Sequence, residues 1–358
     1  MRIIHTADLH LDSKIDGLPT NKSKIRREEI ICTFERLVEY AAKNNVSAII
    51  IAGDMFDTAQ VTVKTKERVL LAIKKYSQID FFYLSGNHDD ENFISAMENT
   101  PNNLKIFSDE WSSYSYDNVV ISGAVFTNSN AKTIYDTLRL SKNNYNVVVM
   151  HGQVAGYKSN EQAELISLPR LKEKNIDYLA LGHIHTFSQG KIDDRANYAY
   201  PGCLDGRGFD ELGDKGFILL DISDREVEAS FINFSSRNLY EYEYCVDGKS
   251  SWYESSNELI EELVKTYDPK SLIKVVLTGS HDTDYYIDKD SLTHKLNDIF
   301  FYAKVYDNTA LKIDLNIYKN DKSVRGEFVR TVLSSNLTTE QKNKVILCGL
   351  SALKGEEV

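Results

Sequence analysis

The chain has 358 residues, of which 42% are hydrophobic and 27% are charged, and it carries a formal net charge of −11. This length allows two domains with full-sized cores, and no apolar run approaches the roughly 18 residues that a membrane span needs. The acidic balance argues mildly against a surface that binds nucleic acid everywhere, although it leaves room for a local basic groove.

The N-terminal sequence and the spacing of the cysteines indicate in which cellular compartment the protein is expected. The chain enters strand-like sequence directly at "MRIIHTADLHLD", without a signal-peptide pattern, so we expect a cytoplasmic protein. The four cysteines lie far apart and never form a CxxC pair. This spacing predicts buried thiols rather than a zinc knuckle or a disulfide framework.

The first part of the sequence alternates short apolar runs with amphipathic stretches. "RIIHTAD" predicts a strand, and residues 24–44 predict a helix because their apolar side chains recur at helical spacing. The same order then repeats, which is typical of βαβ units. The further predicted strands are 46–54 and 79–87, and the further predicted helices are 61–77 and 91–99.

The sequence from residue 117 to about 235 is richer in strands and poorer in helices. This change suggests a second sheet that packs on the first, so residues 1–235 are predicted to form one α/β domain with two sheets. The strands expected in the second sheet are "DNVVISGAVF", "YNVVVMHG", "DYLALGHIH", "NYAYPG" and "KGFILLDI".

The remaining sequence predicts two smaller parts. Residues 236–318 are expected to form a small α+β domain in the order β-α-β-α-β, and residues 319–358 a helical tail. The tail breaks at "SSNLTTEQ", where Thr338 or Thr339 before Gln341 resembles a helix start. The five elements of the small domain are predicted at 239–248, 255–266, 271–280, 289–299 and 301–309.

Polar motifs follow the apolar runs of the first domain, namely "HTADLHLD", "AGDMFD", "SGNHDD", "MHGQ" and "LGHIHT". In doubly wound sheets the strand ends collect at one edge, where binding sites form. The following side chains are therefore expected to converge: Asp8, His10, Asp54, Asn87, His88, His151, His183 and His185.

This set of oxygen and nitrogen ligands contains no cysteine, which suits first-row divalent metals, and it is too large for one ion. Two ions fit. Asp54 is the natural bridge, because a carboxylate has two oxygens and can hold two cations about 3.5 to 4 Å apart. Taken singly, each residue is more often a turn or core residue. Taken together, the motifs predict a dimetal site.

The five motifs resemble the signature of the calcineurin-like metallophosphoesterase superfamily, which is DxH, GDxxD, GNHD/E, a lone His often followed by Gly, and GHxH. The resemblance implies a two-sheet sandwich flanked by helices, in which His88 meets the substrate and is not a ligand. It also implies Mn²⁺ as the first choice of ion, although the ligands would accept Fe²⁺, Zn²⁺ or Co²⁺. One metal would then be held by Asp8, His10, Asp54 and His185, and the other by Asp54, Asn87, His151 and His183.

Within this superfamily the chain is similar to the DNA repair exonuclease branch, the SbcD-type and YhaO-like nuclease subunits. The similarity rests on "RIIHTADLHLDS", "GHIHTFSQ", "YPGCLDGRGFDELGDKGFILLDI" and "SVRGEFVRTVL". It implies that the small domain caps the cleft and selects DNA geometry, and that the tail docks on an SMC-like ATPase, unless the tail packs back on the small domain. It also implies a homodimer, with the helices at 61–77 or 91–99 as candidate contacts.

The leading hypothesis is therefore a metal-dependent DNA nuclease, an exonuclease first and a single-strand endonuclease second. A phosphodiesterase or phosphatase for nucleotides or other small phosphoesters is the enzyme alternative, and the acidic charge favours it. A non-enzymatic adaptor is disfavoured because every ligand and His88 are present.

Other polar residues near the motifs have an ordinary structural explanation as well as a functional one. His5 is expected to be a buried core imidazole rather than a support for a ligand. Asp12 and Asp57 would hold either a metal-ligating histidine or their own loop. Arg207, in "DGRGF", would either contact a substrate phosphate or lie in a plain exposed turn.

Overall fold

The computed structural model describes residues 1–57, 61–86, 89, 100–154, 165–223, 226–282, 285–311, 318 and 320–354. Contacts between residues divide the chain into two compact units, Met1–Tyr240 and Glu241–Val358. The helix predicted at 91–99 lies outside the described residues. None of the described helices is long and apolar enough to cross a membrane.

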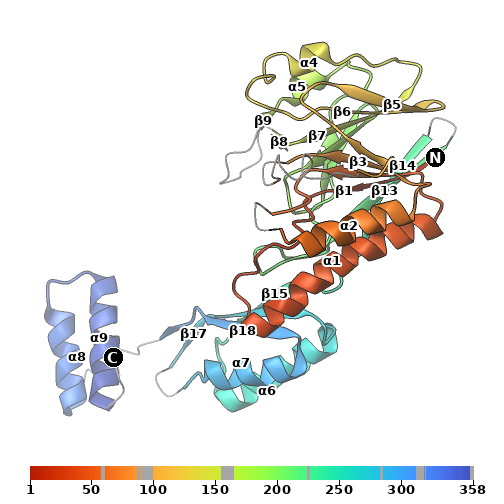
Figure 1. Ribbon diagram of the computed structural model, residues 1–358. Coiled ribbons are helices and arrows are strands. Elements are labelled where there is room, and N and C mark those ends of the chain that lie inside the picture. Colours follow the sequence, from red (N-terminus) through yellow and green to blue (C-terminus); the bar gives the residue numbers. More distant parts are fainter. Residues whose placement is uncertain are drawn as a thin grey trace. The chain divides into compact units, whose positions relative to one another are not determined.

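In the described part of the first unit, two six-stranded sheets pack face to face (Figure 1). Each sheet has a parallel core, with antiparallel pairing at one margin of the first sheet and at both margins of the second. The first has the order β14 (Glu226–Asn233), β13 (Gly216–Ser223), β1 (Arg2–Thr6), β2 (Ala48–Ala52), β3 (Asp80–Leu84) and β4 (Leu104–Ile106). The second has the order β11 (Ser188–Lys191), β12 (Asn197–Tyr200), β10 (Tyr178–Gly182), β7 (Tyr145–His151), β6 (Val119–Gly123) and β5 (Ser112–Tyr116).

Three layers of apolar side chains hold this sandwich together. The central layer joins the sheets, with Ile50 and Phe82 facing Val147 and Ala180. The outer face of the first sheet packs on α1 (Thr20–Lys43) and α2 (Val63–Lys75), and the outer face of the second lies under α4 (Ile134–Thr137) and α5 (Leu168–Leu171) (Figure 1). Strands covered on both faces need apolar residues throughout, which explains the fully buried run of β2. The predicted two-sheet sandwich flanked by helices is confirmed.

The strand predicted at "KGFILLDI" belongs to the first sheet, so its placement in the second sheet was wrong. It forms β13, which pairs antiparallel with β1 through Ile4 opposite Leu219. An apolar run shows that a strand is buried, but it does not show which sheet supplies its backbone partners. A short ladder of β8 (Gln153–Val154) and β9 (Leu165–Ile166) completes the unit.

The expectation of buried thiols holds for one cysteine. Cys203 is buried, whereas Cys32, Cys245 and Cys348 are exposed, and all of them are free thiols. A single small side chain such as cysteine can lie at the surface without cost. The sequence alone therefore did not distinguish the buried cysteine from the exposed ones.

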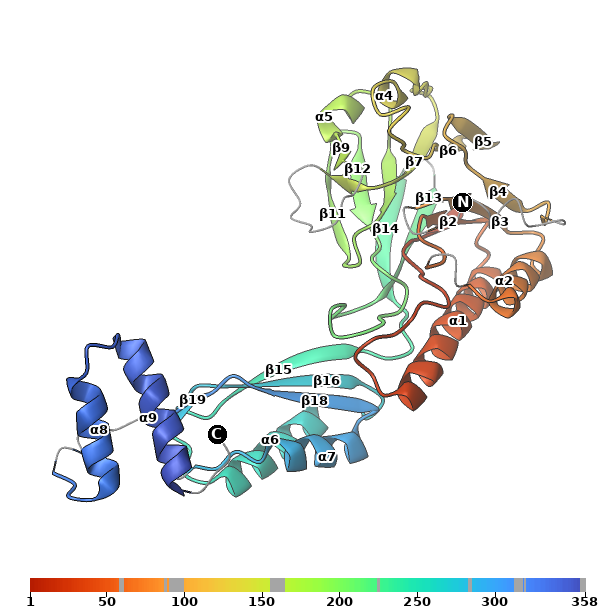
Figure 2. The same cartoon turned by 60° about the vertical axis from the view of Figure 1, so that its left-hand side comes forward.

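The second unit contains the predicted β-α-β-α-β order, with helices α6 and α7 along one face of a three-stranded sheet (Figure 2). Two more helices form a hairpin around Val329 and Ile346. Thr338 begins the second of them, because its hydroxyl accepts from the Gln341 amide at 3.3 Å and its own amide donates to the Gln341 side chain at 3.0 Å. The elements are β15 (Leu239–Cys245), α6 (Trp252–Thr266), β16 (Leu272–Thr278), β17 (Ser280–His281), α7 (Lys289–Ile299), β18 (Tyr302–Asp307), β19 (Ala310–Leu311), α8 (Val324–Ser334) and α9 (Thr339–Lys354).

Candidate metal centre

The polar motifs meet where β1, β2, β7 and β10 end. The structure brings six of the predicted ligands into two groups, and within each group the candidate ligand atoms lie within 4.8 Å of one another. Both groups combine a carboxylate with two imidazoles, a donor set that fits a first-row divalent cation. The first group is Asp8, His10 and His185, and the second is Asp54, His151 and His183.

Asp54 lies between the two groups. One of its oxygens, Oδ2, is 3.4 Å from His151 Nε2 in its own group and 4.0 Å from His10 Nε2 in the other. Within the first group, the Nε2 atoms of His10 and His185 lie 3.1 Å apart. A carboxylate this close to nitrogens of both groups is suited to bridge two cations.

The turns that carry these residues adopt an uncommon backbone. Asp8, His10 and Asp54 have φ values of 50°, 42° and 49°, in the left-handed region that non-glycine residues avoid at a cost of about 1–2 kcal/mol each. Backbone hydrogen bonds between the turns hold them there, because the Asp8 amide donates to the Gly53 carbonyl at 3.1 Å and the His10 amide donates to the Asp54 carbonyl at 3.0 Å. Strain concentrated at converging polar groups is typical of functional sites.

Motif glycines allow the close approach of these turns. A Cβ atom on Gly182 would lie 1.8 Å from the Ala52 carbonyl oxygen, and one on Gly86 would lie 2.1 Å from Asp54 Oδ1. No side chain fits at either contact. Gly86 therefore lies directly against Asp54, and Asp89 accepts from the Phe56 amide at 2.9 Å.

Two of these histidines are oriented by a hydrogen bond from one ring nitrogen. His151 Nδ1 donates to the Ala52 carbonyl at 2.9 Å, and His185 Nδ1 donates to Glu211 Oε1 at 2.7 Å. Each bond places a proton on Nδ1, so Nε2 is the ring atom that faces the site. The His183 amide donates to both oxygens of Asp8, at 2.9 and 3.0 Å, which fixes that carboxylate in the same way.

The buried carboxylates of the centre would be stabilised by additional positive charge. Asp8 is fully buried, and burial raises its pKa to about 7, although the charges of His151 and His185 act in the opposite direction. For His151, burial alone would lower the pKa, but the neighbouring Asp54 raises it to about 9. Protons on these groups thus balance the buried carboxylates, and divalent cations would replace those protons on binding.

The other residues named from the sequence have the following positions. His5 is a core imidazole, because its Nε2 donates to the Leu181 carbonyl at 3.2 Å and its Nδ1 accepts from the Tyr178 hydroxyl at 2.9 Å. Asp12 holds its loop by accepting from the Thr62 amide at 2.7 Å. Asn87 and His88 lie outside the described residues.

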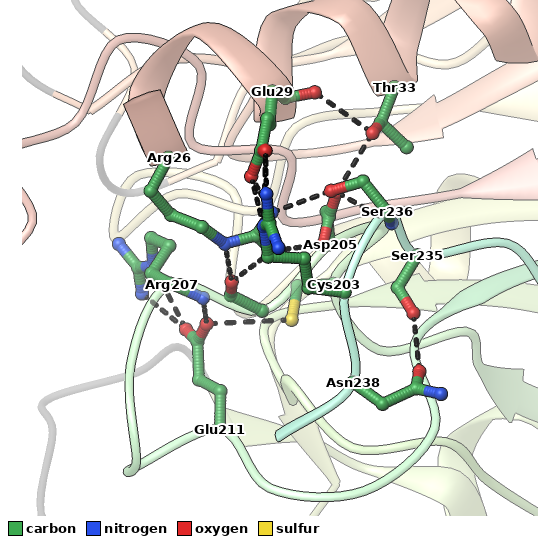
Figure 3. Close-up of polar contacts among 12 residues, drawn as sticks. Arg26, Glu29, Thr33, Cys203, Asp205, Arg207, Glu211, Ser235, Ser236 and Asn238 are labelled. Carbon is green, nitrogen blue, oxygen red and sulfur yellow. Dashed lines mark hydrogen bonds and ion pairs between the residues drawn. The ribbon is translucent and has the colours of Figure 1, made fainter. Parts of the chain in front are cut away.

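Sequence reasoning missed Glu211. This buried carboxylate binds His185, and it also accepts from the Arg207 guanidinium at 2.6 and 2.9 Å (Figure 3). Burial opposes the ionisation of Glu211, but the hydrogen bonds from His185 and Arg207 hold its pKa well below its usual range. No local pattern in "GRGFDELG" marks this role, because the partner of Glu211 comes from a different loop.

Comparison with known proteins agrees with this geometry. The sequence model of the family described as calcineurin-like phosphoesterase matches residues 1–187, which is more than half of the chain. Among curated relatives, the metallophosphoesterase YhaO of Bacillus subtilis is 26% identical, and the match covers 64% of this chain and 60% of the relative.

Two further relatives match over nearly their whole length. The DNA double-strand break repair protein Mre11 of Saccharolobus solfataricus is 25% identical, with 100% of this chain and 96% of the relative covered. A subunit of the nuclease SbcCD from Staphylococcus epidermidis is 20% identical, with 96% of this chain and 97% of the relative covered.

Proposed function

Because the chain belongs to the calcineurin-like phosphoesterase family, as the five sequence motifs indicated, we propose that it is a dimetal-dependent nuclease that hydrolyses phosphodiester bonds in DNA. The observation that carries this proposal is the position of Asp54 between two groups of nitrogen and oxygen ligands. Two metal ions on either side of a bridging carboxylate are the recurrent solution for hydrolysing phosphate esters.

The ligands are proposed to divide into two sets that share Asp54. Asn87 completes the second set in this proposal. The close approach of Gly86 to Asp54 and the hydrogen bond from the Phe56 amide to Asp89 support its inclusion. Mn²⁺ is the proposed ion, and the donor set also accepts Fe²⁺, Zn²⁺ or Co²⁺. The first set is Asp8, His10, Asp54 and His185, and the second is Asp54, Asn87, His151 and His183.

When bound, the two cations would supply Lewis acidity, polarising the phosphate and making hydroxide available at neutral pH. The protein's own part is to hold the ligands in place, which the Nδ1 hydrogen bonds of His151 and His185 and the interlocked turns accomplish. His88 is proposed to donate a proton to the leaving oxygen, since its unperturbed pKa lies near 6.5.

Arg207 is also proposed to contact the substrate phosphate, although two carboxylates already pair with its guanidinium. Its Nε and Nη2 atoms are engaged by Glu211, and its Nη1 atom lies 3.7 Å from Asp57. A guanidinium already paired with two carboxylates has less of its charge available for a phosphate.

DNA is the proposed substrate because two relatives that match over nearly their whole length are named as a break-repair protein and a nuclease subunit. An SMC-like ATPase is the proposed partner, with the α8–α9 hairpin as the docking element, and the cytoplasm is the proposed location. A homodimer is proposed through α2, where Val63 and Leu71 expose 72% and 65% of their surface.

The substrate can be tested with end-labelled duplex and single-stranded DNA and with bis-p-nitrophenyl phosphate as a small phosphodiester. We expect Mn²⁺ to support shortening of DNA from its ends, and EDTA to abolish it. Asp54→Asn is the matched inactive control. Hydrolysis of the small phosphodiester without cleavage of any DNA would instead indicate an enzyme for small phosphoesters, and no hydrolysis of either would contradict the proposal.

The role of His88 can be tested on the same two substrates. If His88 donates a proton, His88→Ala should retain its metal and lose about 10²–10⁴ in the rate of DNA cleavage. The loss should be smaller on bis-p-nitrophenyl phosphate, because nitrophenolate leaves without a proton. Equal losses on both substrates would mean that His88 only orients the phosphate, and loss of metal would mean that it is a ligand.

A further inference from the structure

The segment from Cys203 to Lys215 contacts both the side chain and the backbone of His185. Glu211 Oε1 accepts from the imidazole Nδ1 at 2.7 Å. The backbone carbonyl of His185 accepts from Lys215 Nζ at 2.7 Å and from the Cys203 amide at 3.4 Å. Glu211 and Lys215 are buried, with 3% and 1% exposure, so water does not compete for these bonds.

Glu211 is itself held in one orientation. The Arg207 amide donates to its Oε2 at 2.7 Å, while the Arg207 guanidinium donates to its Oε1 from Nε and Nη2 (Figure 3). Paired contacts of this kind fix the plane of a carboxylate as well as its position. The oxygen that binds His185 is therefore preorganised before any ligand arrives.

The two oriented histidines differ in how they are supported. His151 lies at the end of β7, and its Nδ1 binds the backbone carbonyl of Ala52, the last residue of the buried strand β2. His185 lies on a loop after β10, and its side chain is 30% exposed. No strand carbonyl orients the His185 ring in the described residues. Its Nδ1 is bound by the Glu211 side chain at 2.7 Å, and Arg207 Nη2 lies farther from the same atom, at 3.4 Å.

We propose that Glu211 is a positioning residue of the metal centre, which turns His185 Nε2 toward His10 so that the two imidazoles receive one cation. The 3.1 Å separation of these Nε2 atoms is the geometric result of that orientation. This inference rests on the proposed dimetal function and adds to it. The group formed by Asp8, His10 and His185 depends on Glu211, whereas the group formed by Asp54, His151 and His183 does not.

The test measures Mn²⁺ binding and not catalysis. Mn²⁺ is titrated into the metal-free full-length chain, and bound ions are counted by electron paramagnetic resonance, in which a coupled pair differs from an isolated ion. In Glu211→Ala we expect one ion to bind about 10–100-fold more weakly while the other keeps its affinity. At intermediate Mn²⁺ the coupled-pair signal should give way to that of an isolated ion.

Two further variants separate positioning from a general loss of structure. Glu211→Gln keeps an oxygen acceptor for Nδ1, so its loss should be smaller than that of Glu211→Ala. Asp177→Asn is the matched control, because Asp177 is also clamped by an arginine, Arg195, at 2.9 and 2.8 Å, but at the start of β10. It should lower thermal stability and keep both ions.

Normal two-ion binding by a folded Glu211→Ala chain would overturn the proposal. So would an equal loss of both ions, because a merely structural role affects both sites alike. A wild-type chain that binds a single ion would contradict the dimetal function. In that case the proposed role of Glu211 would still hold if Glu211→Ala lowered the affinity for that ion, and would be wrong if the affinity were unchanged.

Discussion

Asp54 lies close to imidazole nitrogens of both groups and is almost completely buried, with 1% exposure. A buried carboxylate is costly unless positive charge compensates it. Protons on the surrounding histidines supply part of that charge, since the pKa of His151 rises because Asp54 outweighs the effect of burial. Cations held on both sides of Asp54 would supply it more completely.

The proposed bridging role predicts that Asp54→Ala weakens both metal sites together. The change removes one ligand from each proposed set, so elemental analysis after dialysis should find both ions depleted relative to the wild type. Asp221→Ala is a suitable control, because Asp221 is an exposed partner of Arg2 and belongs to neither ligand group. Retention of two tightly bound ions by Asp54→Ala would show that Asp54 is not shared.

His5 predicts a dependence of stability on pH. Burial lowers its pKa to about 3 from an ordinary value near 6.5, although its bond to Leu181 acts in the opposite direction. The unfolded chain therefore binds a proton that the folded chain does not bind between these values, so the stability contributed by neutral His5 is lost as pH falls below about 6.5.

His5→Gln removes the titrating group but keeps an acceptor for Tyr178 and a donor for Leu181. Between pH 6.5 and pH 5 the wild type should lose about 1.6 kcal/mol of unfolding free energy more than this variant, because the slope approaches about 1.4 kcal/mol per pH unit only below pH 6.5. Urea unfolding at the two pH values measures the difference. Identical losses in both proteins would show that His5 gains its proton in the folded chain.

At the scale of elements, a buried polar cluster joins α1 to two distant segments. Asp205 is fully enclosed and pairs with Arg26 of α1, accepts from Thr33 of the same helix at 2.8 Å and accepts from the Ser236 amide at 3.0 Å (Figure 3). Arg26 also donates to the Gly206 carbonyl. The cluster thereby fixes the start of the segment that carries Glu211.

Removing one partner of such a pair leaves the other charge buried and unmatched. Asp205→Ala should therefore lower the free energy of unfolding by about 3–5 kcal/mol. The exposed pair of Arg2 and Asp221 provides the comparison, because Asp221→Ala should cost no more than about 1 kcal/mol. Equal effects of the two substitutions in urea unfolding would contradict the structural role of the cluster.

The sequence predicted those features that depend on residues close together in the chain, and it missed those that depend on distant partners. Asp8, His10, Asp54, His151 and His183 each combine a strand end with a ligand side chain within a few residues, so their convergence followed from the fold class. Glu211 and Asp205 act on partners about 26 and 180 positions away, and nothing in their own sequence identifies those partners. β13 was misplaced for the same reason, since backbone pairing is a long-range property.

At the scale of the whole molecule, α2 carries the proposed surface for self-association. Val63 and Leu71 are exposed apolar residues eight positions apart, which places them on one side of the helix. If the chain is a homodimer through α2, Leu71→Glu should yield a monomer at micromolar concentration by light scattering, with unchanged helix content. A wild-type chain that is already monomeric would contradict the proposed dimer.

The central claim is that two metal ions share Asp54 in this centre. The most direct measurement is anomalous diffraction at the manganese absorption edge from crystals of the full chain grown with Mn²⁺. We predict two peaks about 3.5–4 Å apart, one on each side of Asp54, the first near Asp8, His10 and His185 and the second near His151 and His183. A single peak, or two peaks that do not flank Asp54, would contradict the account.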